Sequence, residues 1–265
     1  MQARWKKDPS SFVRLFFDQK TGRSVGAICK VLATERKIYR CVETPELEKI
    51  AGSHHHGGIV AIVTPGEERM PSAEAVASWV KRREPVLILD RIGNPHNLGA
   101  LARTAAFFGI KNIVIPDSPE ASRGNDAAYR VSEGGLEALE LWVVGDLPHF
   151  LQRLVRAGYE VVGAATRDGK VLHPGDGSAF VNTGSAVPLH SSKSQQARPA
   201  ASEVRGNVPA PVALVMGNEE HGMSPAITAA CTRLVTLAGS GEVESLNVSV
   251  AGALLMWELL VARKK

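Results

Sequence analysis

The sequence predicts an α/β fold, with a parallel sheet covered by helices and preceded by a smaller α/β domain. Beyond residue 80, short apolar runs such as VLILD at 86–90 and NIVIPD at 112–117 alternate with helical patterns such as LGALARTAAFFG at 98–109. Strands that alternate with helices are typical of a parallel sheet. The length of 265 residues also exceeds the roughly 100–200 residues of one domain, which favours two domains.

The first 80 residues are expected to form the smaller domain. The pattern from residue 25 to 64 predicts a helix, the strand IYRCVE, a second helix and the apolar strand GIVAIV, whereas the first 20 residues show no clear period. Residues 64–84 contain turn residues and the basic cluster Lys81–Arg83, so they are expected to form a linker or bridging helix. The predicted domains are therefore 1–80 and 84–265.

The larger domain continues the alternation of strands and helices to its end. The segment at 183–211 is rich in Ser, Ala, Pro and Gln and has no apolar period, so a mobile surface loop is expected there. The remaining elements are predicted as strands at 140–145, 160–166, 212–217 and 233–239 and as helices at 146–159, 224–231 and 245–265.

Positive charge is concentrated in the first third of the chain. Residues 1–83 carry 15 Lys and Arg against 9 Asp and Glu, a net charge of +6, and the remainder carries 16 against 18, a net charge of −2. A basic domain is typical of a protein that binds a polyanion, although a solvated surface would have the same composition.

Several protein classes are disfavoured by composition. No stretch reaches the roughly 18 apolar residues of a membrane helix, and the start lacks the apolar run of a signal peptide. Cys29, Cys41 and Cys231 are too few and too widely spaced for a disulfide framework or a zinc site. Neighbouring side chains of His54–His56 diverge, which also disfavours a metal site. A cytoplasmic protein without a membrane or metal partner is expected.

Three loops that follow predicted strands are candidates for the functional site. Their sequences are DRIGNPHNLGALARTA, GNEEHGMSP and AGSGEVESLNVS, and each combines small residues with a polar group at a helix start. In a parallel sheet, ligands bind beyond the carboxyl ends of the strands. Each polar residue also has a structural interpretation: Asn97 and Ser245 could cap helices, and Glu219 and His221 could be turn residues.

Common enzyme motifs are missing from these loops. No GxGxxG follows the first strand, and neither a Walker phosphate loop nor a GxSxG elbow is present. The sequence therefore disfavours a dinucleotide-binding Rossmann enzyme, a P-loop enzyme and an α/β hydrolase. An unrelated α/β nucleotide-binding enzyme stays an alternative.

The three loops, in this order, resemble the motifs of the SpoU/TrmH family of RNA ribose 2′-O-methyltransferases, which belong to the SPOUT superfamily. The chain reads NLGALARTA, LVMGNEEHG and ESLNVSVA where that family has its motifs, and the resemblance covers residues 84 to 262. The segment ETPELEKIAGSHHHGGIV also resembles the end of the substrate-binding domain, similar to a ribosomal protein, that family members often carry.

The resemblance implies an enzyme that methylates the ribose 2′-hydroxyl of tRNA or rRNA with S-adenosylmethionine. It implies a C-terminal trefoil knot and a homodimer whose interface includes the last helix. The apolar neighbours of Trp257 on that helix favour a core or interface position for it over an RNA-stacking platform. Arg103 is expected to position phosphate or ribose rather than act as a base, because guanidinium stays charged near neutral pH. The implied catalytic residues are Asn97, Arg103, Glu219, Ser245 and Asn247, and the implied cofactor-binding residues are Gly217, Leu237 and Leu246.

Two positions depart from the family pattern. Ala238 stands where the third motif usually has proline, and Glu220 stands where a small residue usually follows the acidic residue. A related protein that binds RNA and cofactor without catalysis is therefore a second alternative. The sequence does not specify which RNA or which nucleotide is the substrate.

Overall fold

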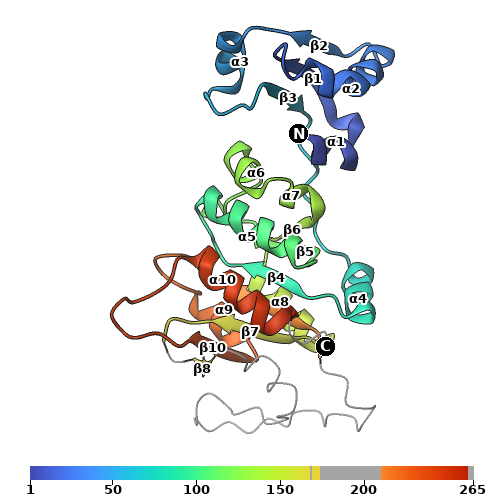
Figure 1. Cartoon of the computed structure of the whole chain (residues 1–265). Helices are drawn as coiled ribbons and strands as arrows, with labels where there is room; N and C mark the ends of the chain where they lie inside the picture. Colours follow the sequence, from blue (N-terminus) through green and yellow to red (C-terminus); the bar gives the residue numbers. More distant parts are fainter. Residues whose placement is uncertain (168, 174–209, 262–265) are drawn as a thin grey trace, which may run out of the picture. The chain divides into compact units, whose positions relative to one another are not determined.

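The computed structural model describes residues 1–167, 169–173 and 210–261 and contains two compact units, Met1–Glu67 and Glu68–Lys265 (Figure 1). The predicted loop at 183–211 lies outside the described residues, except for its last two positions. Within the described part of the chain, no helix is long and apolar enough to cross a membrane.

The first unit is a three-stranded sheet with a helix on each face. Strand β1 is parallel to β2 and antiparallel to β3. Phe12, Leu15 and Phe17 of β1 pack with α2 on one face, and Phe16 packs with Leu47 of α3 on the other. The elements are α1 (Gln2–Lys7), a 3-10 turn (Pro9–Ser11), β1 (Phe12–Phe17), α2 (Gly22–Thr34), β2 (Ile38–Cys41), α3 (Thr44–Ala51) and β3 (Ile59–Val63).

The second unit is built on a seven-stranded parallel sheet with the order β6-β5-β4-β9-β7-β10-β8. This arrangement confirms the predicted α/β class with a parallel sheet. The strands are β4 (Val86–Leu89), β5 (Asn112–Pro116), β6 (Glu140–Val144), β7 (Glu160–Ala164), β8 (Lys170–Leu172), β9 (Val212–Met216) and β10 (Arg233–Leu237). The helices are α4 (Ala73–Arg82), α5 (Pro95–Phe107), α6 (Asp126–Ser132), α7 (Gly135–Ala138), α8 (Leu147–Arg156), α9 (Pro225–Ala230), α10 (Val248–Met256) and a π-helical turn (Trp257–Val261).

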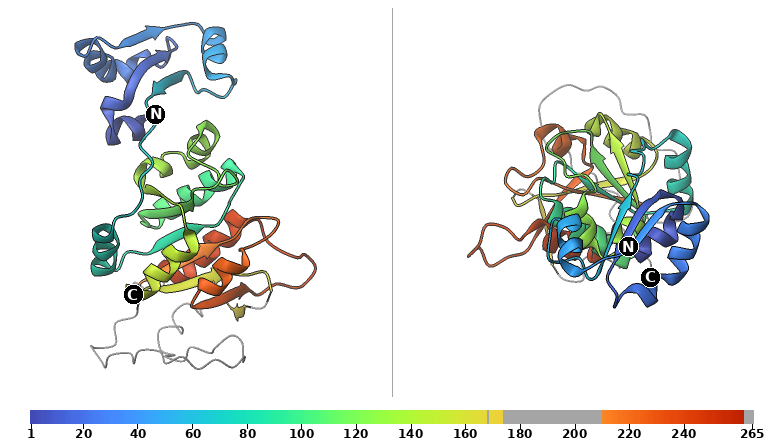
Figure 2. Two further views of the ribbon diagram at one scale, coloured as in Figure 1. Left: turned by 180° about the vertical axis from the view of Figure 1, so that it is seen from behind. Right: turned by 90° about the horizontal axis from the view of Figure 1, so that it is seen from above.

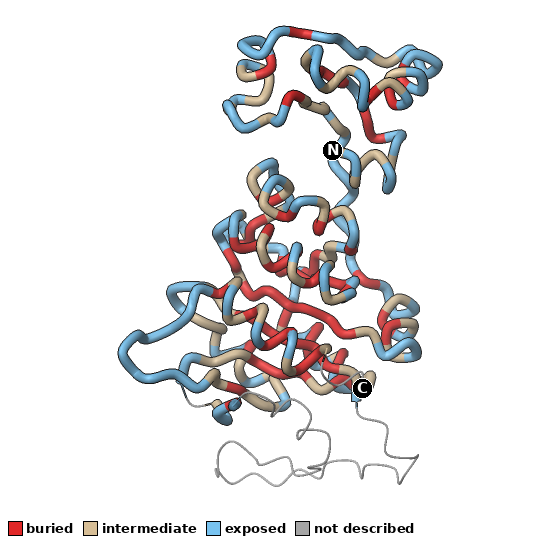
Figure 3. The backbone as a smooth tube through the Cα atoms, viewed as in Figure 1, coloured by how far each residue is buried: buried red, intermediate tan, exposed pale blue. Residues whose placement is uncertain are grey.

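Helices cover both faces of this sheet, because successive residues of a strand point to opposite sides. Leu87 and Leu89 pack on the side of α5 and α10, whereas Val86 and Ile88 pack on the side of α4, α8 and α9. Figure 1 views the first side and the left panel of Figure 2 views the second. The four residues of β4 are fully buried, and they lie in the deeply buried centre of the sheet in Figure 3.

The units divide earlier than the expected boundary near residue 80. Helix α4, predicted as a bridging helix, belongs to the second unit because its buried Val76 and Trp79 join the core on the α8 side. The preceding segment is also tied to this unit, because Val143 donates its amide to the carbonyl of Arg69. A hydrophobic anchor in α4 therefore places the division between Glu67 and Glu68.

Some elements were absent from the sequence prediction. Strand β1 was not predicted because its burial pattern is irregular, with two exposed residues between Phe12 and Leu15 at a β-bulge. Helices α6 and α7 were missed because they are short, and β8 because it has three residues. The final helix begins later than predicted, at Val248 instead of residue 245, and a π-helical turn follows Met256.

Candidate active site

The three candidate loops lie at one edge of the large sheet. They follow β4, β9 and β10, and all strands of this sheet run in the same direction, so the three carboxyl ends share that edge. This is the edge at which parallel α/β folds bind ligands. Residues far apart in the sequence are thereby brought together.

The loop after β4 leads directly into α5, which carries Asn97. Asn94, not Asn97, is the N-cap of this helix: its side chain accepts a hydrogen bond from the amide of His96, and Pro95 occupies the first helical position. The capping interpretation of Asn97 is therefore wrong. Asn97 is 8% exposed, and its amide side chain points into a cluster with residues of the other two loops.

The loop after β9 forms a tight turn that presents Glu219. Asn218 and Gly222 exchange two backbone hydrogen bonds, and Gly222 has a φ of 65°. At Gly217 a Cβ atom would overlap the backbone of Gly222, so only glycine fits. The Asn218 side chain accepts hydrogen bonds from the amides of Glu220 and His221, which fixes the turn around Glu219.

The loop after β10 ends in the N-cap of α10. That cap is Asn247 rather than Ser245, because Asn247 Oδ1 accepts hydrogen bonds from the amide and the hydroxyl of Ser249. Its Nδ2 donates to Asn97 Oδ1 at 3.2 Å, and Asn97 Nδ2 donates to Glu219 Oε1 at 2.8 Å. One residue from each loop therefore joins a continuous hydrogen-bonded chain, Asn247 to Asn97 to Glu219.

This hydrogen-bonded network has an unused hydrogen-bond acceptor on its exposed side, the carboxylate of Glu219. Glu219 is exposed and its Oε2 makes no hydrogen bond with another described residue. An ionised carboxylate accepts up to about four hydrogen bonds, so Glu219 retains acceptor sites toward solvent. A carboxylate oriented by a buried amide can accept a hydrogen bond from a hydroxyl group of a ligand.

The other predicted site residues lie apart from this chain of contacts. The guanidinium of Arg103 forms an ion pair at 2.9 Å with Glu133, which follows α6, and both side chains are more than half exposed. Ser245 and Leu246 lie in the exposed segment 238–247, and Leu246 is 47% exposed. Leu237 is partly buried against the core at the end of β10. Within one chain, Arg103 and Ser245 are therefore not joined to Asn97 by the described contacts.

Two positioning groups were not found by sequence reasoning. Asn218 Nδ2 donates to the carbonyl of Arg91 at 2.8 Å, and buried Asp90 accepts the amide of Ser224 at 3.0 Å. Asp90 also holds Arg91, a hydrogen bond that raises the pKa of the guanidinium. These contacts attach the turn after β9 to the end of β4. The aspartate that ends VLILD was the available signal, because a buried acid at a strand end requires partners.

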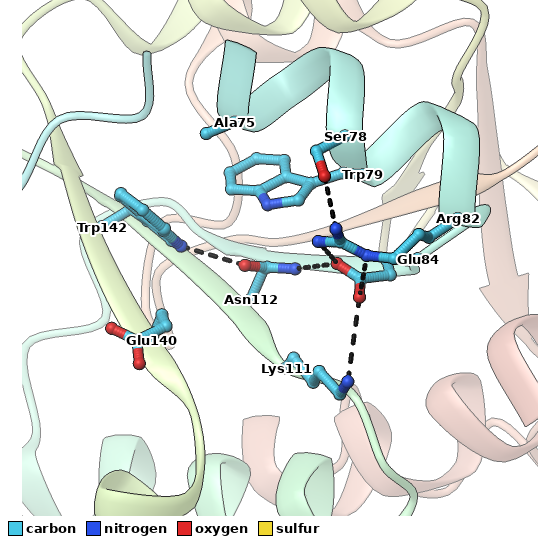
Figure 4. Close-up of a pocket in the computed structure, with 9 residues that line it drawn as sticks. All are labelled: Ala75, Ser78, Trp79, Arg82, Glu84, Lys111, Asn112, Glu140 and Trp142. Carbon is cyan, nitrogen blue, oxygen red and sulfur yellow. Dashed lines mark hydrogen bonds and ion pairs between the residues drawn. The ribbon is translucent and has the colours of Figure 1, made fainter.

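A second polar cluster lines a pocket at the opposite edge of the same sheet (Figure 4). Its centre is Glu84, which accepts hydrogen bonds from Arg82 at 2.9 Å and from Asn112 at 3.2 Å. Asn112 in turn accepts a hydrogen bond from Trp142 at 3.0 Å. Arg82 lowers the pKa of Glu84 through this hydrogen bond. The side chains of Glu84 and Asn112 form hydrogen bonds with each other and with Arg82 and Trp142, which is typical of a structural cluster.

Metal and thiol chemistry find no support in the described residues. No group of three or more His, Cys, Asp or Glu is arranged to hold a metal there, and His54 pairs with Glu48. The three cysteines are free thiols, as expected. Burial raises the pKa of Cys231 to about 12.

Sequence comparisons give relatives of the whole chain. An uncharacterized tRNA/rRNA methyltransferase, YfiF of Escherichia coli O157:H7, is 29% identical over 97% of this chain and 64% of its own length. The chain thus spans less than two thirds of that relative. A protein of Pseudomonas aeruginosa named 23S rRNA (guanosine-2′-O-)-methyltransferase RlmB is 31% identical over 78% of this chain and 71% of its own length.

Structure and family comparisons agree with these relatives. The crystal structure of an AdoMet-bound rRNA methyltransferase from Sinorhizobium meliloti matches with a TM-score of 0.69 and 17% identity, covering 97% of this chain and 84% of that one, which shows a shared fold. Residues 2–69 match the family described as RNA 2′-O ribose methyltransferase substrate binding. Residues 84–257 match the SpoU rRNA Methylase family, so the chain belongs to that family.

Proposed function

We propose that this protein transfers a methyl group from S-adenosylmethionine to the ribose 2′-hydroxyl of a nucleotide in structured tRNA or rRNA. The observation that carries the proposal is the hydrogen-bonded chain from Asn247 through Asn97 to Glu219, which unites the three family motifs at one edge of the sheet. The relative named for guanosine 2′-O-methylation of 23S rRNA supports the same reaction class.

The cofactor-binding role is assigned to the loops after β9 and β10. The backbone of Gly222 packs closely against Gly217 and leaves no room for a side chain there, and both glycines are partly exposed. Leu237 and the exposed Leu246 provide apolar contact surface beside exposed backbone of the segment 238–247. Small residues, backbone groups and leucines fit a nucleoside with an amino-acid tail. When bound, S-adenosylmethionine supplies an electrophilic methyl group.

The hydrogen-bonded residues Asn247, Asn97 and Glu219 orient the ribose and its 2′-hydroxyl group. The exposed oxygen of Glu219 accepts a hydrogen bond from the ribose, while the buried amide of Asn97 keeps the carboxylate in place. With S-adenosylmethionine bound, the 2′-oxygen of this ribose would accept the methyl group that the cofactor supplies, and the hydroxyl proton would leave to solvent or a shared acceptor. Alignment of the reacting atoms is the largest contribution such a site can make.

Arg103 is assigned to the phosphate or ribose of the target nucleotide. Its side chain is 57% exposed and pairs with Glu133, whose side chain is 64% exposed, so an RNA phosphate can replace that partner. A role as base is physically demanding because guanidinium keeps its proton near neutral pH. Ser245, which is exposed in one chain, is likewise assigned to a site that RNA or a second chain completes.

A homodimer is proposed from an exposed apolar surface on α5 and α10. Phe107 is 81% exposed, Trp257 52% and Leu254 46%, and the rings of Phe108 and Trp257 lie 5.8 Å apart. Trp257 is therefore not a core residue of the described chain, and its exposed apolar neighbours favour a subunit interface over an RNA-stacking platform. A contiguous apolar surface of this kind is typical of a subunit contact.

The remaining assignments follow the family. The first unit is proposed as the RNA-binding domain, the C-terminal segment as a trefoil knot, and the cytoplasm as the location of the protein. The basic charge of residues 1–83 supports the first assignment.

The reaction is tested by transfer of labelled methyl groups from S-adenosylmethionine to unmodified tRNA and rRNA. We expect label in 2′-O-methylribose with the intact protein and loss of label with Arg103→Ala. Arg130→Ala is the matched control, because it removes an exposed arginine from α6 close in sequence to the Glu133 partner. Loss of transfer in both variants would contradict a specific role of Arg103.

Failure of the intact protein separates the alternatives. Cofactor binding without transfer to either RNA pool would favour the non-catalytic relative, and absence of cofactor binding would refute the proposed reaction.

For the dimer, Leu254→Arg is expected to give monomers in light scattering. Val155→Arg on α8, where Val155 is 37% exposed, should leave the dimer intact.

A further inference from the structure

One half of a sheet face in the first unit is left uncovered. Residues paired across neighbouring strands lie on the same face of a sheet, so Arg14, Phe16, Ile38 and Arg40 share one face of β1 and β2. Helix α3 covers Phe16, which is 8% exposed. The other three residues of this set are exposed.

The uncovered half combines apolar and basic side chains. Arg14 of β1 lies between Ile38 of β2 and Ile62 of β3, its direct neighbours in the register. Ile38 is 48% exposed and Ile62 41%. Arg40 follows two residues after Ile38, on the same side of β2. Arg14, Ile38, Arg40 and Ile62 are called the open sheet face below.

Both arginines of the open sheet face are available for a ligand. Neither Arg14 nor Arg40 forms a hydrogen bond or ion pair with another described residue. By contrast, Arg4 binds Ser11, Asp8 and the carbonyl of Thr64, and Lys37 binds Glu35. Among the residues that the structure describes, Arg14 and Arg40 therefore carry unpaired guanidinium groups on hydrogen-bonded strands, where the backbone position is fixed.

We propose that the open sheet face binds a single-stranded segment of the RNA substrate. Two guanidinium groups on adjacent strands match consecutive phosphates in charge, and the flanking isoleucines offer apolar contact to ribose and base faces. Unstacked bases in loops expose such faces, whereas a duplex buries them. The inference rests on the proposed function for its substrate class, RNA, and adds the surface and the type of segment that is bound.

The inference is tested with the full chain and two fluorescent probes, an unstructured 20-nucleotide RNA and a duplex of the same sequence. The double variant Arg14→Gln/Arg40→Gln should bind the single strand about tenfold more weakly, and its salt dependence should decrease by about 1.4 in log–log slope, from about 0.7 per lost phosphate contact. Arg23→Gln/Lys30→Gln is the matched control, because it removes the same charge from the exposed side of α2.

The contribution of the two isoleucines, Ile38 and Ile62, is measured separately. Ile38→Ala/Ile62→Ala should weaken binding of the single strand without a change in the salt slope, because no charge is removed. Equal losses in the two charge-reducing variants, or an unchanged salt slope in Arg14→Gln/Arg40→Gln, would overturn the inference. Stronger binding of the duplex than of the single strand would also overturn it.

The outcome is distinguishable from failure of the proposed function. If the intact protein methylates RNA and the Arg14→Gln/Arg40→Gln variant binds and methylates normally, the function stands and the inference about the open sheet face is overturned. If the intact protein transfers no methyl group, the function fails, while the probe affinities still decide whether this face binds RNA.

Discussion

The two polar clusters at opposite edges of the large sheet differ in how completely they are satisfied. At the amino edge, the side chain of Glu84 is 13% exposed, and its carboxylate accepts hydrogen bonds from Arg82 and Asn112. Its backbone carbonyl accepts a further bond from Tyr159 at 2.7 Å. At the carboxyl edge, Asn97 is buried but the two residues that it joins, Glu219 and Asn247, are exposed.

This difference separates a structural cluster from a binding cluster. A satisfied, mostly buried network stabilises the fold because each broken bond leaves a desolvated group without a partner. A network with a buried centre and two exposed ends keeps its geometry while it offers free acceptors to a ligand. Substitutions at the carboxyl edge should therefore mainly change activity, and substitutions at the amino edge should mainly change stability.

The largest effect is expected for Asn97→Ala. This change removes the donor that orients Glu219 and the acceptor that holds Asn247, so methyl transfer should fall by about 100-fold or more. The matched variant at the other edge is Asn112→Ala, which should lower the free energy of unfolding by about 2 kcal/mol. Its activity per folded molecule should be unchanged.

Initial rates of methyl transfer and chemical denaturation of both variants measure these effects. A comparable loss of activity in both asparagine variants would contradict the distinction between the two edges.

The next effect concerns Asn218, which holds the turn around Glu219 without contacting the free acceptors. Asn218→Ala removes one donated and two accepted hydrogen bonds, and we expect kcat/KM to fall about tenfold through a less ordered carboxylate. Asn218→Asp keeps both accepted bonds and should retain intermediate activity. A stability change without this graded order of kcat/KM would indicate a purely structural residue.

The order of the longer elements of the second unit and the positions of the three loops could be predicted from the sequence. Apolar runs such as VLILD and VALVMG are buried on both faces, so their pattern is independent of neighbouring elements. The shared edge of the loops followed from the parallel arrangement. The meeting of Asn97, Glu219 and Asn247 agrees with the predicted site, while the roles of these residues stay predictions.

Hydrogen-bond partners could not be predicted in the same way. The N-caps are Asn94 and Asn247 instead of Asn97 and Ser245, because several polar residues precede each helix and only the backbone conformation selects one. The network around Glu84 joins residues 28 positions apart, and no periodic pattern encodes such a contact. Arg103 forms an ion pair with Glu133, which directly follows a helix that the sequence analysis missed.

A smaller effect is expected for Glu84→Gln, which keeps the shape of the amino-edge cluster and removes its charge. At pH 7 we expect the free energy of unfolding to fall by about 1–2 kcal/mol, because the hydrogen bonds from Arg82 and Asn112 weaken. Activity per folded molecule should not change.

The pH dependence of this loss has a definite sign. Arg82 lowers the pKa of Glu84 in the folded protein below its unfolded value, which is about 4.3. The carboxylate therefore stabilises the fold above the unfolded pKa, and this contribution is lost as pH falls through the folded pKa. Denaturation of Glu84→Gln and the intact protein at pH 7 and at pH 3.5 should show a smaller difference at the lower pH. A constant difference would contradict the ion-pair interpretation.

The last prediction concerns the access of a reagent to the core between the two edges of the sheet. Cys231 packs with the core on the α8 side, and its thiol pKa is raised to about 12 by burial and by the charge of Asp90. Cys41 is exposed in the other unit and serves as an internal control. At pH 8, iodoacetamide should modify Cys231 at least about 100-fold more slowly than Cys41, because the thiolate is the reactive form.

Asn218→Ala should reduce the difference in alkylation rate between Cys231 and Cys41. Asp90 holds Ser224 at the end of the turn after β9, so loosening of this turn should increase access to Cys231. Glu84→Gln should leave this difference in alkylation rate unchanged, because the Glu84 cluster lies at the opposite edge of the sheet. Peptide mapping of the alkylated cysteines reads both results in one experiment. Faster modification of Cys231 in Glu84→Gln than in Asn218→Ala would show that the amino edge, rather than the site turn, controls access to the core.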